Sequence, residues 1–300
     1  MNIEDWPADE ILRIARTSGK SLEVRCAEAF LAQNWTARLG SYFADGALDV
    51  PRELDVLAER GARLHTAPDV TAKIRAVISC RGFPNERSPL TYSVSNASVP
   101  SFTPRLVVEH RGPWPLNDVG TNWGPLRSYE AVSAGHLLNG AKLANARHIV
   151  AFDQIERTEG TKKVKSGPQK VTVNFTRMKE GDSGLFKAID SAVKAAQFWG
   201  REDYQTAGCF ATITVPVLLL GASFWDVCID GGRVTDPRFA PKAFMVNLFP
   251  TPGAPARELM SLIWSVDEIA SLVYLLDQTF AWFTSEINKE YGTATARPGG

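Results

Sequence analysis

Two acidic residues, Glu53 and Asp55, stand within the otherwise apolar stretch RELDVLA at 52–58. A second stretch, AVISCRG at 76–82, places Ser79 and Arg81 where an apolar strand should end. A buried carboxylate loses its hydration, and it needs a cation, a metal ion or several hydrogen bonds to offset that loss. The pairing of these two stretches therefore indicates a chemical site or the remnant of one.

Strand geometry predicts how these residues meet. Successive side chains of a strand point to opposite faces, so Glu53 and Asp55 share one face of the first stretch and the apolar residues at the intervening positions take the other. The same rule places Ser79 and Arg81 together. If the two strands are neighbours, Asp55 lies beside Ser79 and Arg81, and Glu23 on the preceding helix approaches the same end of the sheet.

The first half of the chain is expected to run helix, strand, strand, strand. Apolar residues recur at helical spacing over 7–17 and again over 21–33, which carries Glu23. Three stretches of strand-forming residues follow at 35–43, 52–59 and 70–81, with an Asp-Gly turn after the first. Prolines between 84 and 125 then predict loops and edge strands.

The second half predicts further helices and buried strands. Helices are expected at 128–144, 185–199 and 266–287, and strands at 148–152, 209–220, 243–248 and 258–265. The segment 157–179 is rich in Lys, Thr and Gly and predicts a flexible basic loop, and 293–300 predicts a disordered tail. No internal repeat or strong linker divides the sequence, so we expect a single α/β domain over residues 1–300.

The composition is that of an ordinary globular protein, with 44% apolar and 22% charged residues in 300. Its 33 basic and 33 acidic residues balance, so the charge of the whole chain does not argue for nucleic acid or anionic lipid. The longest apolar run, near 215–222, is shorter than the roughly 18 residues that a membrane span needs. The N-terminal segment is acidic and lacks an apolar signal region. We therefore expect a cytoplasmic protein without membrane contact.

The four cysteines and four histidines show no spacing typical of metal ligands, so a zinc site is not expected. Cys80 stands between Ser79 and Arg81, but strand alternation sends its side chain to the opposite face. It is therefore expected to be a core residue and not a nucleophile. The sequence also contains no nucleophile-elbow pattern around Ser79 and no glycine-rich phosphate loop.

The helix and the three strands resemble the PD-(D/E)XK, or restriction-endonuclease-like, superfamily. The resemblance covers roughly residues 20–82: Glu23 on the helix, 40–45 in the first strand, 52–58 in the second, and SCR at 79–81 in the third. It implies a mixed sheet flanked by helices with an αβββαβ core, over about residues 20–155, to which additional strands and helices are attached.

The resemblance also implies metal-dependent hydrolysis of DNA. Asp55 would be the central metal ligand and Glu23 the helix carboxylate near the metal, with Glu53 as a further ligand. Carboxylates hold magnesium, which activates a water and stabilises the charge that develops on the phosphate. A role in defence against foreign DNA would follow from the family.

The sequence departs from the superfamily at two positions, because Ser79 replaces the acid and Arg81 replaces the lysine. Serine is a poorer magnesium ligand than a carboxylate, and arginine, with a pKa above about 12, does not readily give up a proton. Two readings stay open. One is a divergent, active nuclease in which Glu53 or Glu23 substitutes for the missing acid. The other is a catalytically inactive nuclease fold that binds nucleic acid or a protein partner, including a second copy.

A third reading is that Glu53 and Asp55 simply pair with Arg52, Arg75 or Arg81 at the rim of a sheet, where ion pairs contribute about 0–1 kcal/mol. The basic loop is either solvated or in contact with phosphate. Its candidates for nucleic-acid binding are Lys162, Lys163 and Lys165.

Overall fold

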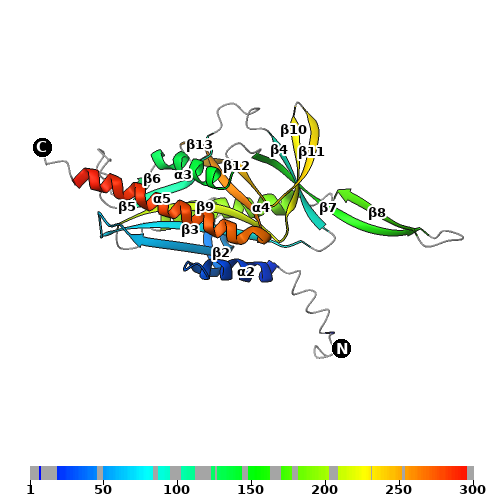
Figure 1. The fold of residues 1–300 in the computed structure, drawn as a ribbon, viewed down its shortest axis with the longest axis horizontal. Helices are drawn as coiled ribbons and strands as arrows, with labels where there is room; N and C mark the ends of the chain where they lie inside the picture. The colour runs from blue at the N-terminus through cyan, green and yellow to red at the C-terminus, as the bar shows by residue number, and fades with distance from the viewer. Residues whose placement is uncertain are drawn as a thin grey trace.

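The computed structural model describes residues 7, 19–45, 50–83, 87–94, 103–111, 123–125, 127–143, 148–162, 170–177, 182–202, 209–230, 232–251 and 254–295. Within these ranges one mixed sheet of 13 strands has helices on both faces, which confirms the expected α/β class (Figure 1). The helix expected at 7–17 falls, apart from residue 7, outside the described residues. The tail expected from 293 begins within the last helix, which continues to Thr295.

The first helix and three strands form where the sequence predicts them. Helix α2 (Gly19–Leu31) is followed by β1 (Thr36–Asp45), β2 (Val50–Arg63) and β3 (Val70–Arg81), which pair as an antiparallel meander. The buried residues of α2 recur at helical spacing, and the face that they form packs against the meander. After α2 the chain turns at Asn34, which has a φ of 60° and so adopts the left-handed conformation that asparagine tolerates.

The strand beside β3 comes from much later in the chain. Strand β9 (Cys209–Leu220) runs parallel to β3 over its whole length, from the pair Val70–Cys209 to the pair Arg81–Leu220. Helix α4 (Asp182–Glu202) precedes β9 in the chain. Both strands are largely buried on both faces, which explains the nearly continuous apolar sequence of β9. In β3 the partly exposed positions are Thr71, Lys73 and Arg81. The nuclease-like core expected over about residues 20–155 therefore does not include β9, the strand that lies beside β3.

The other edge of β9 changes partner along its length. Strand β5 (Val107–Arg111) pairs antiparallel with the first half of β9, and β13 (Ala254–Ser265) pairs parallel with the second half. Pro216 lies between Thr214, the last residue paired with β5, and Val217, the first paired with β13. Proline has no N–H to donate, and at this change of partner a ladder bond is not required from it.

The remaining strands extend the sheet away from β13 in the order β12 (Lys242–Thr251), β7 (His148–Lys162), β4 (Arg87–Val94), β10 (Phe224–Asp230) and β11 (Arg233–Ala240). Strand β6 (Trp123–Pro125) pairs with β5. The segment 157–179 was expected to be a loop, but its described residues belong to β7 and β8 (Lys170–Arg177), which form a hairpin. The alternating Val, Thr and Phe residues of β8 explain the strand, and the high Lys and Gly content hid it.

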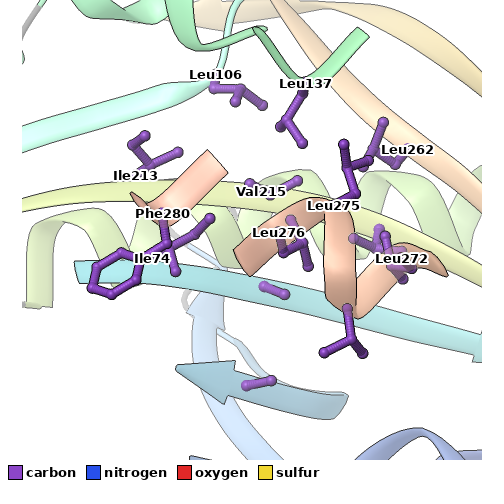
Figure 2. Close-up of a cluster of buried hydrophobic side chains, with 14 of the residues drawn as sticks. Ile74, Leu106, Leu137, Ile213, Val215, Leu262, Leu272, Leu275, Leu276 and Phe280 are labelled. Atoms are coloured by element: carbon purple, nitrogen blue, oxygen red, sulfur yellow. The ribbon is translucent and has the colours of Figure 1, made fainter. Parts of the chain in front are cut away.

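Helices cover the two faces of the sheet unequally. Helix α4 packs on one face through an apolar stripe that includes Leu185, Ile189 and Val193. Helices α2, α3 (Arg127–Gly140) and α5 (Ile269–Thr295) cover the other face. Figure 2 shows the centre of this second core, where side chains of α3, α5 and the sheet strands gather. No helix in the described part of the chain is long and apolar enough to cross a membrane.

One buried cation joins β2, β3 and α4. The guanidinium of Arg75, which is 2% exposed, lies 2.6 Å from Oε1 of Glu59 and donates to the carbonyl of Trp199 at 2.7 Å. It also lies over the indole of Trp199, 5.7 Å from the ring centroid. Burial acts to raise the pKa of Glu59, but Arg75 and Arg38 outweigh it and hold this pKa below its ordinary value. The charged pair is thus satisfied on every side.

The core under α5 gives a first prediction. Leu276 is fully buried, whereas Tyr274 on the same helix is 66% exposed. Replacing Leu276 by Ala removes buried contacts and leaves a cavity, so we expect Leu276→Ala to lower the free energy of unfolding by about 2–5 kcal/mol. Tyr274→Ala is the matched control and should change it by less than about 0.5 kcal/mol. Urea denaturation followed by circular dichroism measures both, and equal effects would contradict the packing described for α5.

The Glu59–Arg75 pair gives a prediction for pH dependence. Because the folded pKa of Glu59 lies below its unfolded value of about 4.5, its contribution is present above that pH and is lost as the pH falls through the folded pKa. We expect Glu59→Gln to be less stable than the wild type at pH 7, and the two to converge as the pH falls below 4.5. Denaturant unfolding between pH 3 and pH 7 tests this, and parallel curves would refute it.

Candidate functional site

Asp55 lies where β2 separates from β3. The ladder between these strands runs from the pair Arg63–Thr71 to the pair Val56–Ile78 and stops one residue short of Asp55. On the other side, the ladder between β1 and β2 omits the position where Asp55 would pair with Gly40, which has a φ of 61°. Leu54 and Val56 consequently pack into cores on opposite faces of the sheet. The alternation expected from the sequence is therefore broken at Asp55, because Gly40 adopts a conformation that other residues rarely take.

The carboxylate of Asp55 fills the gap that this separation leaves. Its Oδ2 accepts a hydrogen bond from the backbone N–H of Cys80 at 2.6 Å and one from the Ser79 hydroxyl at 3.1 Å. The N–H of Cys80 is thus satisfied by a side chain where the neighbouring strand no longer pairs. The same oxygen lies 3.8 Å from Nη1 of Arg81. The three positions that the sequence predicted to meet are in contact.

Arg81 is held at the surface end of β3. Its Nη1 donates to the carbonyl of Cys80 at 2.9 Å, and its side chain is 41% exposed, against 17% for Asp55. The guanidinium is therefore fixed on one side and open to solvent on another. Such a group can bind an anion, but it is a poor proton acceptor.

A lysine joins the other two candidate carboxylates. The ammonium of Lys20, at the start of α2, lies 2.9 Å from Oε2 of Glu23 and 3.4 Å from Oε1 of Glu53. The side chain of Glu23 is 7% exposed and that of Glu53 is 43% exposed. The hydrogen bond with Glu23 is the main cause that raises the pKa of Lys20 above its ordinary value. Sequence analysis did not select Lys20, although its three-residue spacing from Glu23 on a helix was a usable signal.

Cys80, between Ser79 and Arg81 in β3, is a core residue. It is buried with Cys26 of α2, as expected for a core cysteine. The hydrogen bond with Cys26 and burial raise the pKa of the Cys80 thiol well above its usual value, and the charges of Asp55 and Glu23 add to the rise. The thiol is therefore protonated at neutral pH and is not a nucleophile.

The donors present do not fit a magnesium ion in this arrangement. Magnesium takes an octahedral set of oxygens that usually includes one or two carboxylates. Across the described ranges, no three His, Cys, Asp or Glu side chains lie close enough together to hold a metal ion. Lys20 stands beside Glu23 and Glu53, and Arg81 stands near Asp55, so each carboxylate has a protein cation near it. Ser79, at the position of the missing acid, adds only a hydroxyl.

The lysines selected from the sequence belong to a different part of the molecule. Lys162 is the last residue of β7, on the β7–β8 hairpin, where it pairs with Lys170. Lys163 and Lys165 lie outside the described residues. Strands β7 and β3 do not pair with each other, so the hairpin and the Asp55 site are separate features of the sheet.

The contacts of Asp55 predict a structural cost for its removal. Asp55→Ala leaves the buried N–H of Cys80 without its acceptor, so we expect the free energy of unfolding to fall by about 1–3 kcal/mol. Asp55→Asn keeps an oxygen acceptor at the same place and should lose less. Glu53→Ala, at the exposed neighbouring acid, is the control and should be close to neutral. Urea denaturation at pH 7 distinguishes them, and an equal loss in the Ala and Asn variants would show that the charge, and not the hydrogen bond, is what matters.

Comparison of the chain with family models, curated proteins and solved structures found no match to any of them. The chemistry of this site is therefore argued from its own geometry. That geometry joins a strand carboxylate, a hydroxyl and an arginine at one end of the β2–β3 pair, and a lysine joins a helix glutamate to Glu53 of β2.

Proposed function

We propose that the protein is a restriction-endonuclease-like protein that binds DNA and whose metal-dependent phosphodiesterase site is impaired. The order of elements supports the fold assignment. Helix α2 precedes the antiparallel strands β1, β2 and β3, and α4 then precedes β9, which lies parallel beside β3. This is the αβββαβ order that the resemblance implies, with β4 to β8 and α3 inserted between β3 and α4.

The observation that carries the proposal is the contact of Asp55 with Ser79 and Arg81. These are the positions that the resemblance assigns to the metal-binding aspartate, the acid and the lysine. They come from two different strands and meet at the point where those strands separate. Lys20 joins Glu23 of α2 to Glu53, two residues before Asp55 in β2, and this contact supports the role that the resemblance implies for the helix glutamate.

The same contacts favour binding over cleavage. The hydroxyl of Ser79 donates to Asp55, whereas a carboxylate at that position would add a second metal ligand. The ammonium of Lys20 holds Glu23 and Glu53. The half-exposed guanidinium of Arg81 remains as a group suited to a DNA phosphate. The proposed setting is the cytoplasm, with defence against foreign DNA as the biological role.

A magnesium-dependent nuclease is the second candidate. It is favoured by one observation, that Lys20 contacts both Glu23 of α2 and Glu53, which stands two residues before Asp55 in β2. In that case Mg²⁺ would be the cofactor. A chain that only binds, alone or with a protein partner, needs no cofactor.

DNA binding and cleavage separate these candidates. We expect the wild type to bind a labelled duplex without added metal, more weakly as salt rises, and to leave plasmid DNA uncut in magnesium or manganese. Arg81→Ala should weaken binding by at least about threefold, since a phosphate contact is lost. Arg63→Ala, an exposed arginine at the opposite end of β2, is the matched control.

Two outcomes would change the assignment. Metal-dependent cutting that disappears in Asp55→Asn would establish the active nuclease, because that variant removes the charge and keeps the acceptor for Cys80. Absence of DNA binding at low salt by the folded wild type would refute the DNA proposal. A Ser79→Asp/Arg81→Lys variant restores the acid and the lysine of the superfamily pattern. We expect it to gain metal-dependent cutting of DNA. A variant that folds normally and still does not cut would count against the proposal that this site derives from a nuclease site.

A further inference from the structure

Two aromatic side chains lie exposed at paired positions near one edge of the sheet. Trp225 of β10 and Phe239 of β11 stand opposite each other in the ladder and are 41% and 62% exposed. Their ring centroids are 5.6 Å apart, with the ring planes at 64°. Figure 1 shows β10 and β11 next to β4, at the top of the view. Adjacent exposed aromatic rings, unlike a single exposed apolar residue, are typical of a binding surface.

These two rings lie on the face of the sheet that α4 does not cover. The neighbouring pair of the same ladder, Phe224 and Ala240, points the other way, into the core under α4. Among the residues that the structure describes, the core under α2, α3 and α5 contains none from β4, β10 or β11. The rings are therefore presented outward and are not the rim of a helix contact described above.

The register continues this face across the neighbouring strands. Trp225 pairs with Leu90 of β4, and Leu90 pairs with Asp153 of β7. Residues directly opposite each other in a ladder share a face. Leu90 and Tyr92, two residues further along β4, are half-buried. From β11 through β10, β4 and β7 to β8 the face spans about 19 Å, since neighbouring strands lie about 4.8 Å apart. We call it the aromatic face.

Arginine side chains lie at the other end of the aromatic face. Arg177 of β8 pairs with Ile155, two residues after Asp153, and so shares its face. Its Nε donates to Oδ2 of Asp153 at 2.8 Å, while its side chain is 70% exposed. Arg157, two residues after Ile155, is also exposed. Asp153 is only 2% exposed and also accepts from the hydroxyl of Tyr92 at 2.8 Å. The exposed charge on the described side chains of this face is therefore positive.

We propose that the aromatic face binds single-stranded DNA, with bases stacked on Trp225 and Phe239 and phosphates toward Arg177 and Arg157. Aromatic rings accept any base by stacking, and neighbouring cations hold the backbone of the strand. A duplex keeps its bases within the stack and does not offer them to such rings.

The inference rests on the proposed DNA binding and adds the form of DNA and a second surface to it. Strands β9, β13, β12, β7 and β4 separate β3, which carries Arg81, from β10 in the sheet. The aromatic face and the Asp55 site can therefore be tested independently.

Fluorescence anisotropy tests the proposal with a labelled oligothymidylate of about 12 nucleotides and the corresponding duplex. The ring variant, Trp225→Leu/Phe239→Leu, removes both rings and keeps apolar side chains. The control is Tyr42→Leu/Tyr274→Leu, which removes two rings that are 64% and 66% exposed on β1 and α5. We expect the ring variant to bind the single strand at least about fivefold more weakly, the effect of losing one stacked base. Its affinity for the duplex and its melting temperature should be unchanged.

Salt dependence tests the arginine end of the face. Arg157→Gln should reduce the slope of log K against log salt for the single strand by about 0.7, as expected for one lost phosphate contact. Arg63→Gln, at an exposed position of β2, is the control and should leave this slope unchanged. An unchanged slope in Arg157→Gln would remove Arg157 from the contact.

The outcomes separate this inference from the broader proposal. Unchanged single-strand affinity in the ring variant, with tight wild-type binding, overturns the stacking surface and leaves the DNA proposal in place. An equal loss in the control variant overturns the assignment to the aromatic face, and wild-type binding to the duplex alone overturns the single strand. A dimeric wild type that becomes monomeric in the ring variant, with single-strand affinity unchanged, assigns the face to a second copy instead. No wild-type binding to either DNA overturns both proposals.

Discussion

The ladder between β3 and β9 is the constraint on which the other elements depend. Its two strands are covered on both faces, so every backbone group along it must find a partner within the sheet and most side chains must be apolar. The helices are arranged to meet this requirement, with α4 on one face and α2, α3 and α5 on the other. Arg75 is a buried exception, and it is satisfied by Glu59 and a helix carbonyl.

The candidate site lies where β2 ends its pairing with β3, because a backbone group of β3 must find another partner there. There the N–H of Cys80 has no strand carbonyl opposite it, and the carboxylate of Asp55 takes that place. One residue therefore serves the sheet and stands at the position that the nuclease resemblance gives to the metal ligand. This double role accounts for an acid within an apolar strand even where cleavage is impaired. It also separates Asp55 from Glu23 and Glu53, which are satisfied by Lys20 alone among the contacts described for them.

Sequence patterns predicted the strands and helices that are buried along most of their length. The bounds of β3 and β9 match the expected 70–81 and 209–220, because β9 is apolar along almost all of its length and most buried positions of β3 are apolar. The meeting of Asp55, Ser79 and Arg81 also followed from alternation. The break at Asp55 did not, since it depends on the conformation of Gly40 in another strand. Strands β10 and β11 were missed and β8 was taken for a loop, because their short segments mix polar and apolar residues and show only a weak strand period.

The distance along the chain between β3 and β9 has a consequence for how the protein is made. The ribosome completes β3 at Arg81 and must add residues 82–208 before β9 begins at Cys209. At about 5–20 residues per second this takes roughly 6–25 s, during which the inner edge of the meander has no partner. An unpaired apolar strand edge is a template for association with other chains. During this period the edge of β3 that β9 later covers is open to association with other chains.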